Sequence, residues 1–233
     1  HLTKVDSEYP DNKLTGATFE VYKDSNANGK LDDGDELLGT LTEKEKGEYS
    51  MNDLFHGHYF VKETKAPEGF VLDTGVSEVM IDTNGKTYEV ENKAGVGFIN
   101  EAMRGNLKIV KTSSDGKVKG FAFRITGANG YDIILETNDK GEIFIDGLRI
   151  GDYTISEVSN SASSMYVIPA GKKAMVKLGS TTIVEMHNVL RDTPKTGDTT
   201  NLPLLYALAG LSAVGIAVCG VVGFKKKKKE DRN

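Results

Sequence analysis

One set of sequence landmarks occurs twice in this 233-residue chain, in the same order. The landmarks are an apolar segment that carries a lysine, a Gly-x-Tyr segment that ends in glutamate, and a segment that ends in asparagine. They are Leu2–Asp6, Gly57–Glu63 and Tyr88–Asn92 in the first copy, and Ile109–Ser113, Gly151–Glu157 and Val184–Asn188 in the second. Repetition of this kind predicts two copies of one domain.

The landmarks lie in short segments rich in Val, Ile, Thr, Tyr and Phe, with apolar residues at every second position and Gly, Asn or Asp between the segments. This pattern predicts an all-β chain of two tandem antiparallel β-sandwiches, residues 1–100 and 101–191. Each sandwich has an ordinary domain size. The single cysteine, Cys219, lies outside both of them, so neither contains a disulfide and each needs another source of stability.

Three polar residues of each copy fall on the inward side of their strands when residues are counted in twos from apolar neighbours. They are Lys111, Glu157 and Asn188 in the second copy, and Lys4, Glu63 and Asn92 in the first, where Asn100 is the alternative to Asn92. An unpaired charge is costly in a protein core, so such a set requires an explanation.

A reaction among the three residues explains their position. Burial lowers the pKa of a lysine and raises that of a carboxyl group, so Lys111 can be a neutral amine that attacks the side-chain carbonyl of Asn188. Ammonia then leaves while Glu157 transfers the protons, and an amide bond joins the first strand to the last. The alternative is an ordinary edge ion pair, worth about 0–1 kcal/mol. Lys108 is the rival of Lys111, but alternation points it to the polar side.

The C-terminal part of the sequence has its own order of features. The pentapeptide Thr-Pro-Lys-Thr-Gly, in a linker of residues 192–201, precedes an apolar segment (202–224) and a basic tail (225–233). The apolar segment is long enough to cross a hydrocarbon core of about 30 Å as a helix. The lysines of the tail favour a cytoplasmic C-terminus. A plain single-pass anchor is the simpler alternative.

This order resembles the sorting signal of Gram-positive surface proteins, in which a sortase cleaves a Leu-Pro-x-Thr-Gly motif between Thr and Gly. The resemblance implies that Thr196 is joined to peptidoglycan or to another pilin subunit, after a stage in the membrane, and that the domains lie at the cell surface. Thr193 stands where leucine is usual. The implied motif residues are Thr193, Pro194, Lys195, Thr196 and Gly197.

The repeated domains resemble Cna B-type (SpaA-like, prealbumin-like) domains, which build the stalks and pilins of Gram-positive adhesins. The resemblance rests on the Lys, Glu, Asn order, on the Gly-x-Tyr strand and on the segment Val61–Phe70. The second copy keeps its glutamate but has Val158-Ser159-Asn160 after it. The family implies intramolecular isopeptide bonds, Lys4 to Asn92 and Lys111 to Asn188, whose formation Glu63 and Glu157 catalyse.

An acidic insertion at residues 24–36 has the spacing of an EF-hand calcium loop. It also resembles calcium loops in the B repeats of Sdr-type staphylococcal surface proteins. A solvated acidic hairpin is the alternative, because Asn-Gly and Asp-Gly are ordinary turn dipeptides. A bound Ca²⁺ would stiffen the domain without chemistry. The candidate ligands are Asp24, Asn26, Asn28, Lys30 through its carbonyl, Asp32 and Asp35.

The net charge of −5 makes nucleic acid an unfavourable partner. We therefore expect a cell-wall-anchored stalk, not an enzyme, that presents an adhesive region. The alternatives are a pilin subunit polymerised by sortase and the stalk of a larger secreted enzyme. An exported protein needs a signal peptide, and His1–Lys4 already predicts a strand. We thus expect a C-terminal fragment of a longer protein whose upstream region meets a host ligand.

Overall fold

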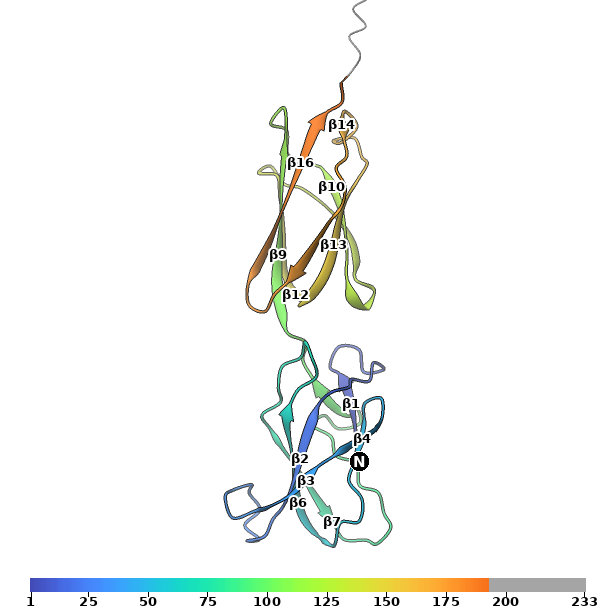
Figure 1. Cartoon of the computed structure of the whole chain (residues 1–233), viewed down its shortest axis with the longest axis vertical. Helices are drawn as coiled ribbons and strands as arrows, with labels where there is room; N and C mark the ends of the chain where they lie inside the picture. Colours follow the sequence, from blue (N-terminus) through green and yellow to red (C-terminus); the bar gives the residue numbers. More distant parts are fainter. Residues whose placement is uncertain (193–233) are drawn as a thin grey trace, which may run out of the picture. The chain divides into compact units, whose positions relative to one another are not determined.

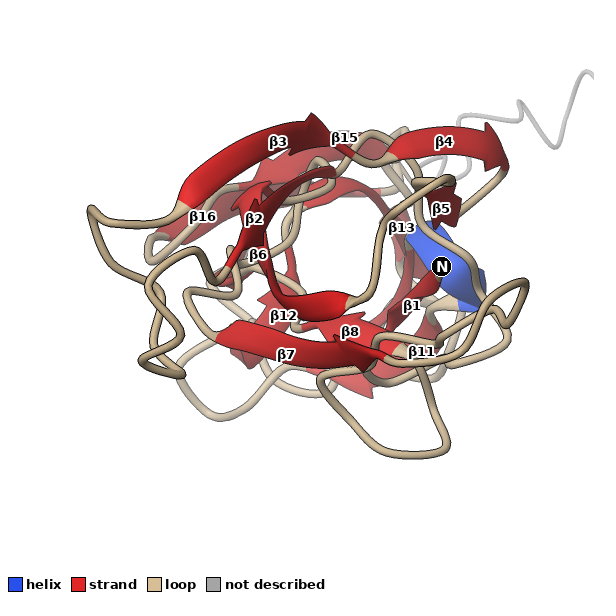
Figure 2. Ribbon diagram, turned by 90° about the horizontal axis from the view of Figure 1, so that it is seen from below, coloured by secondary structure: helices blue, strands red, loops and turns tan. Residues whose placement is uncertain are grey.

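The computed structural model describes residues 1–192, which consist of strands and loops with one short helical turn, η1 (Ala128–Gly130) (Figures 1 and 2). His1–Leu190 forms one compact unit. Among residues 1–192, no helix is long and apolar enough to cross a membrane. The pentapeptide 193–197 and the apolar segment 202–224 lie outside the described residues.

The first sandwich contains two four-stranded sheets, with strand orders β4-β5-β1-β8 and β3-β2-β6-β7. β1 and β8 pair in parallel, and the other pairs are antiparallel. The first and last strands of the sandwich therefore lie side by side. The strands are β1 (Leu2–Asp6), β2 (Thr18–Lys23), β3 (Glu36–Thr40), β4 (Thr42–Glu45), β5 (Glu48–Ser50), β6 (Gly57–Lys65), β7 (Val76–Ile81) and β8 (Phe98–Asn100).

Three aromatic side chains join the two sheets of the first sandwich. Phe19 of β2 packs edge-on against Tyr49 of β5 and Phe98 of β8, with ring centroids 5.2 and 4.9 Å apart. All three are almost completely buried. Aromatic residues dominate the energetics of cores of this size, so this cluster holds β8 against the opposite sheet.

The second sandwich repeats the arrangement, with strand orders β12-β9-β16-β14 and β11-β10-β13-β15. Here β9 and β16 form the parallel pair. Its core includes Leu107, Ile109, Phe123, Ile155 and Met186. The strands are β9 (Arg104–Ser113), β10 (Ala122–Thr126), β11 (Asp132–Glu136), β12 (Glu142–Arg149), β13 (Gly151–Val158), β14 (Tyr166–Val167), β15 (Lys172–Val176) and β16 (Thr181–Leu190).

The predicted all-β fold with two sandwiches is confirmed, but the sandwiches are not wholly antiparallel as predicted, because β1 with β8 and β9 with β16 pair in parallel. The closing strand of the first sandwich also differs from the expected Tyr88–Asn92. That segment belongs to no strand, and Val90 N–H instead donates to the His1 carbonyl. β8 takes the place beside β1. Gly97 allows this close approach, because its φ is +126° and a Cβ there would lie 2.8 Å from the carbonyl oxygen of Thr3.

Candidate functional site

A buried lysine, glutamate and asparagine meet in the first sandwich. Lys4 comes from β1, Glu63 from β6 in the opposite sheet, and Asn100 from β8. All three are buried. Asn100 Nδ2 donates to Glu63 Oε2 at 2.7 Å, and Lys4 Nζ donates to the Phe98 carbonyl at 2.8 Å. The site therefore lies in the core between the two sheets, with the first and last strands on one side and β6 on the other.

The same set recurs in the second sandwich, where Lys111 comes from β9, Glu157 from β13 and Asn188 from β16. All three are buried. Asn188 Nδ2 donates to Glu157 Oε1 at 2.6 Å. The ammonium group of Lys111 lies over the ring of Phe121, 4.2 Å from its centroid, and donates to the Thr112 carbonyl.

Strand register shows that the two sites are equivalent. Lys4 lies opposite Phe98, two residues before Asn100, and Lys111 lies opposite Met186, two residues before Asn188. On the other sheet, each glutamate lies opposite a phenylalanine of the neighbouring strand. These pairs are Glu63 with Phe19 and Glu157 with Phe123.

The structure therefore brings Asn100, and not Asn92, to Glu63. Asn92 is exposed, and its side chain bonds to Asp73 and to the backbone of Ile99. The expected equivalence of Tyr88–Asn92 with Val184–Asn188 fails because the chain forms a further turn before the three-residue strand β8. Lys108 points away from the core and pairs with Glu142 at 2.7 Å.

Burial shifts the protonation of both sites towards neutral groups. In the first sandwich, burial lowers the pKa of Lys4 from 10.5 to about 8, although the carboxylates of Glu63, Asp73 and Asp6 oppose the change. Burial also raises the pKa of Glu63, against its hydrogen bond from Asn100. The pKa of Lys111 is lowered and that of Glu157 is raised, again chiefly by burial.

Each site contains buried oxygen atoms without a hydrogen-bond partner. They are one carboxyl oxygen of each glutamate and the side-chain carbonyl oxygen of each asparagine: Glu63 Oε1, Asn100 Oδ1, Glu157 Oε2 and Asn188 Oδ1. Such atoms are rare in native proteins, because leaving them unpaired costs free energy. A protonated glutamate that donates to the asparagine carbonyl would satisfy two of the atoms in each site.

Sequence reasoning did not find the loop residues that complete the first site. The backbone N–H of Asp73 donates to Glu63 Oε2 at 2.8 Å, and the Val71 carbonyl accepts a hydrogen bond from Asn100 Nδ2. Both contacts use backbone atoms, which no side-chain pattern reveals. Asp6 was also missed, although it follows Leu2 and Lys4 by alternation and is fully buried.

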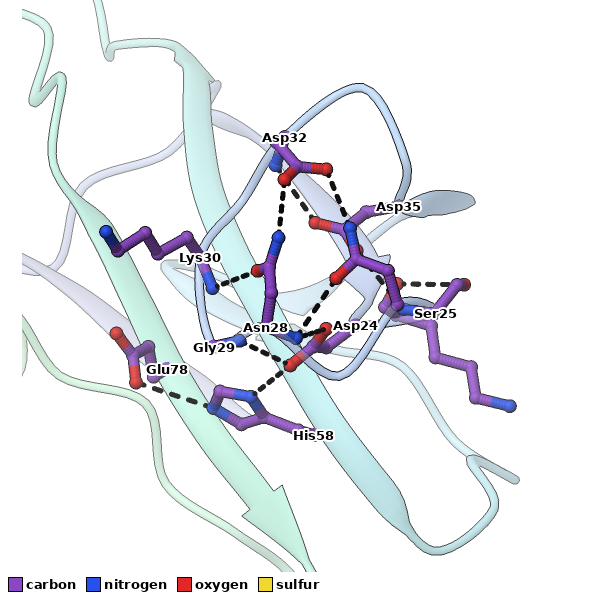
Figure 3. A network of polar contacts seen from close by, with 11 residues as sticks. Asp24, Ser25, Asn28, Gly29, Lys30, Asp32, Asp35, His58 and Glu78 are labelled. Atoms are coloured by element: carbon purple, nitrogen blue, oxygen red, sulfur yellow. Dashed lines mark hydrogen bonds and ion pairs between the residues drawn. The ribbon is translucent and has the colours of Figure 1, made fainter.

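The acidic insertion forms an exposed loop between β2 and β3 (Figure 3). Asp24 Oδ2 accepts hydrogen bonds from the Gly29 N–H and from His58 Nδ1. Asn28 donates its backbone N–H to Asp24 and its side-chain amide to Asp32. Further hydrogen bonds hold the loop closed. Asp35 accepts bonds from the N–H groups of Ser25 and Asp32. The side chain of Asn26 donates to Asp32, and the Lys30 N–H donates to Asn28 Oδ1.

The oxygen-rich donor set of this loop fits a hard cation, since carboxylate and amide oxygens are the ligands that Ca²⁺ prefers. The hydrogen bond with His58 is the main cause that lowers the pKa of Asp24, and hydrogen bonds within the loop, first that from the Gly34 N–H, lower the pKa of Asp32, so both are carboxylates at neutral pH. Within residues 1–192, no three His, Cys, Asp or Glu side chains cluster as a metal site, so Asn and backbone oxygens would have to complete the coordination.

The fold and the two sites define a protein built from tandem prealbumin-like β-domains. The chain matches the SpaA family, described as a prealbumin-like fold domain, over residues 1–94 and 105–189, and it belongs to that family. No curated protein sequence matches it.

Among solved structures, the Bacillus anthracis TIE protein is similar at 24% identity and a TM-score of 0.57, over 81% of this chain and 33% of that protein. The chain thus spans about one third of that relative. GBS52, the minor pilin of Streptococcus agalactiae, aligns at 18% identity and a TM-score of 0.39, over 84% of this chain and 97% of its own. The pilus adhesin SpaC of Lactobacillus rhamnosus GG aligns at 14% identity and a TM-score of 0.48, over 81% of this chain and 31% of its own.

Proposed function

We propose that the chain is a stalk segment of a Gram-positive surface protein, in which each sandwich forms one intramolecular isopeptide bond. The bonds join Lys4 to Asn100 and Lys111 to Asn188. The observation that supports the proposal most is the occurrence of two buried Lys, Glu and Asn sets at equivalent register positions. Ordinary edge ion pairs would leave these charges in water.

The chemistry follows from the buried groups. The neutral amine of Lys4 attacks Cγ of Asn100 while the protonated carboxyl of Glu63 polarises the carbonyl. A C–N bond forms and the original C–N bond breaks. One proton passes from the lysine nitrogen, through Glu63, to the departing amide nitrogen, which leaves as ammonia. Each sandwich reacts once, so the role is structural and involves no turnover.

The intact mass of residues 1–192 tests this proposal, since His1–Leu190 is a compact unit with two cores of its own. The expected mass is that of the plain sequence less two ammonia molecules. Glu63→Gln and Glu157→Gln should each restore one ammonia, and the double variant both. Glu142→Gln is the control, because Glu142 also pairs with a lysine but has no asparagine partner in this contact. An unchanged wild-type mass would refute the bond chemistry.

The same proposal includes anchoring: a sortase cleaves after Thr196 and joins it to the envelope or, in a pilin, to a neighbouring subunit. The pentapeptide, apolar segment and basic tail support it by their order. A Gram-positive host expressing the full chain behind an export signal should retain it in the cell-wall fraction. Thr196→Ala should move it to the membrane fraction, and high-mass ladders would favour the pilin. Equal cell-wall retention of Thr196→Ala would refute this step.

We also propose that the loop 24–36 binds Ca²⁺. The support is its EF-hand spacing and the approach of Asp24 and Asp32 to a common residue, Asn28 (Figure 3). The ion would connect β2 to β3 and so stiffen the first sandwich.

A further inference from the structure

Asn92 holds the edge strand of the first sandwich in the way a neighbouring strand would. Its Oδ1 accepts the Ile99 N–H at 2.6 Å, and its Nδ2 donates to the Ile99 carbonyl at 2.9 Å. Ile99 stands between Phe98, whose carbonyl binds the amine of Lys4, and Asn100. Since β8 is an edge strand of three residues, this side chain supplies backbone pairing that the sheet lacks there.

Asn92 is also linked to the catalytic carboxyl group. Its Nδ2 donates to Asp73 Oδ2 at 2.7 Å, and the backbone N–H of Asp73 donates to Glu63 Oε2 at 2.8 Å. Glu63 Oε2 in turn accepts the amide of Asn100. Asn92 is therefore connected to two parts of the site. Its bonds to Ile99 hold the strand that carries Asn100, and its bond to Asp73 holds the loop whose N–H group binds Glu63.

We propose that Asn92 is a positioning residue for formation of the Lys4–Asn100 bond, an inference that rests on the isopeptide chemistry proposed above. Asn92 fixes β8 and the loop at Asp73, so that the carbonyl carbon of Asn100 stays in line with the amine of Lys4. A misplacement of about 1 Å can slow a reaction about 100-fold, so a clip on such a short strand affects the rate strongly.

The second sandwich does not need the same device. Asn188 lies in β16, a strand of ten residues that pairs with β9 along eight of them and also pairs with β14. Its side chain is held by Glu157. A long strand with neighbours on both sides keeps its register without a side-chain clip. The rate of bond formation in the second site therefore serves as an internal reference for the rate in the first site.

The test follows bond formation in residues 1–192 after a short pulse of cell-free synthesis, with samples quenched in acid and both cross-linked peptides quantified by mass spectrometry. Asn92→Ala should slow the Lys4–Asn100 bond about tenfold or more and leave the Lys111–Asn188 bond unchanged. Asn138→Ala is the matched control, because Asn138 is exposed and accepts two backbone N–H groups in the second sandwich. It should leave the Lys4–Asn100 rate unchanged.

Two further measurements separate positioning from mere stability. First, thermal unfolding is measured for the double variant Asn92→Ala, Glu63→Gln, which cannot form the first bond. The inference requires that this double variant still unfolds cooperatively, at a temperature above that of the assay. Second, Asn92→Asp is compared with wild type across pH. The introduced carboxyl group can both accept and donate hydrogen bonds only when it is protonated. The rate of Lys4–Asn100 bond formation in Asn92→Asp, relative to wild type, should therefore rise on acidification, whereas the relative rate in Asn92→Ala should not.

The outcomes are distinct. An unchanged Lys4–Asn100 rate in Asn92→Ala overturns the inference, as does a slower rate explained by an unfolded first sandwich. A flat relative pH profile for Asn92→Asp also overturns it. If the wild-type protein loses no ammonia at all, the isopeptide chemistry itself fails, and this inference fails with it.

Discussion

Asp6 and Arg149 form a two-point ion pair, with Nη1 2.6 Å from Oδ2 and Nη2 2.8 Å from Oδ1. Asp6 belongs to β1, two residues after Lys4, and its side chain is fully buried. Arg149 ends β12 of the second sandwich and also contacts Glu8 and the ring of Tyr9. The strand that carries Lys4 is thus tied to the following domain by a charge-assisted contact.

Loss of the Arg149 side chain should destabilise the protein strongly. Arg149→Ala leaves the carboxylate of Asp6 buried without its main partner, and breaking a buried pair in this way costs about 3 kcal/mol. We expect a lower unfolding temperature by calorimetry on residues 1–192.

Arg124→Ala is the matched control for Arg149→Ala, because Arg124 makes a similar two-point pair with Asp132 but both side chains are well exposed. Exposed pairs contribute little, so this change should be close to neutral. Equal losses in the two variants would contradict the importance of burial.

The proposed cross-links should account for a large part of the stability of each sandwich. The proposed Lys4–Asn100 bond would close a loop of nearly one hundred residues, and a bond across such a loop stabilises by about 4–5 kcal/mol through the unfolded chain. The loop closed by the Lys111–Asn188 bond is shorter, but the entropy of loop closure depends on the logarithm of loop length, so this bond should stabilise its sandwich by a similar amount.

Calorimetry of Glu63→Gln and Glu157→Gln, on samples whose mass shows the restored ammonia, measures these two contributions separately. Variants that lack a bond yet unfold at the wild-type temperature would show that the cross-link is not the source of stability.

The lowered pKa of Lys4 should make stability depend on pH in a protein that cannot form the Lys4–Asn100 bond. In Asn100→Ala, Lys4 remains free, with a pKa of about 8 in the folded state of the parent structure against 10.5 when unfolded. The unfolded chain binds more protons between these values, so stability should rise as pH increases from about 8 to 10.5, whereas below about 8 the lysine is protonated in both states and its contribution should be lowest and constant.

Urea unfolding of Asn100→Ala across this pH range, compared with the Lys4→Met, Asn100→Ala protein, isolates the lysine. The methionine variant retains the bulk of the side chain but has no proton to bind. The difference between the two proteins should therefore change with pH. A constant difference would show that burial does not shift the pKa of Lys4.

The sequence was most informative where strands are long. Alternation along β9, β13 and β16 predicted that Lys111, Glu157 and Asn188 point inwards, and each is buried. The first sandwich closes with a strand of three residues, which is too short to show a period. A segment that ends in Asn92 imitates the expected strand, yet the turn at Gly95–Gly97 delays pairing until Phe98. The apolar pair Phe98 and Ile99 before Asn100 was the available signal.

Binding of Ca²⁺ by the loop 24–36 should be visible in the stability of the first sandwich. If Asp24 and Asp32 bind the ion, Ca²⁺ should raise the unfolding temperature of the first sandwich, because a ligand that binds only the folded state stabilises it. Extracellular sites of this type have dissociation constants of about 10⁻⁴–10⁻³ M, so millimolar Ca²⁺ suffices. Asp24→Asn with Asp32→Asn should abolish the shift, whereas Asp139→Asn, in an exposed pair with Lys119, should retain it. The shift should be absent with Mg²⁺, which demands near-ideal octahedral geometry and loses its bound waters reluctantly. Equal shifts in all variants would place the ion elsewhere, and no shift in wild type would leave the loop as a hairpin closed by its own hydrogen bonds.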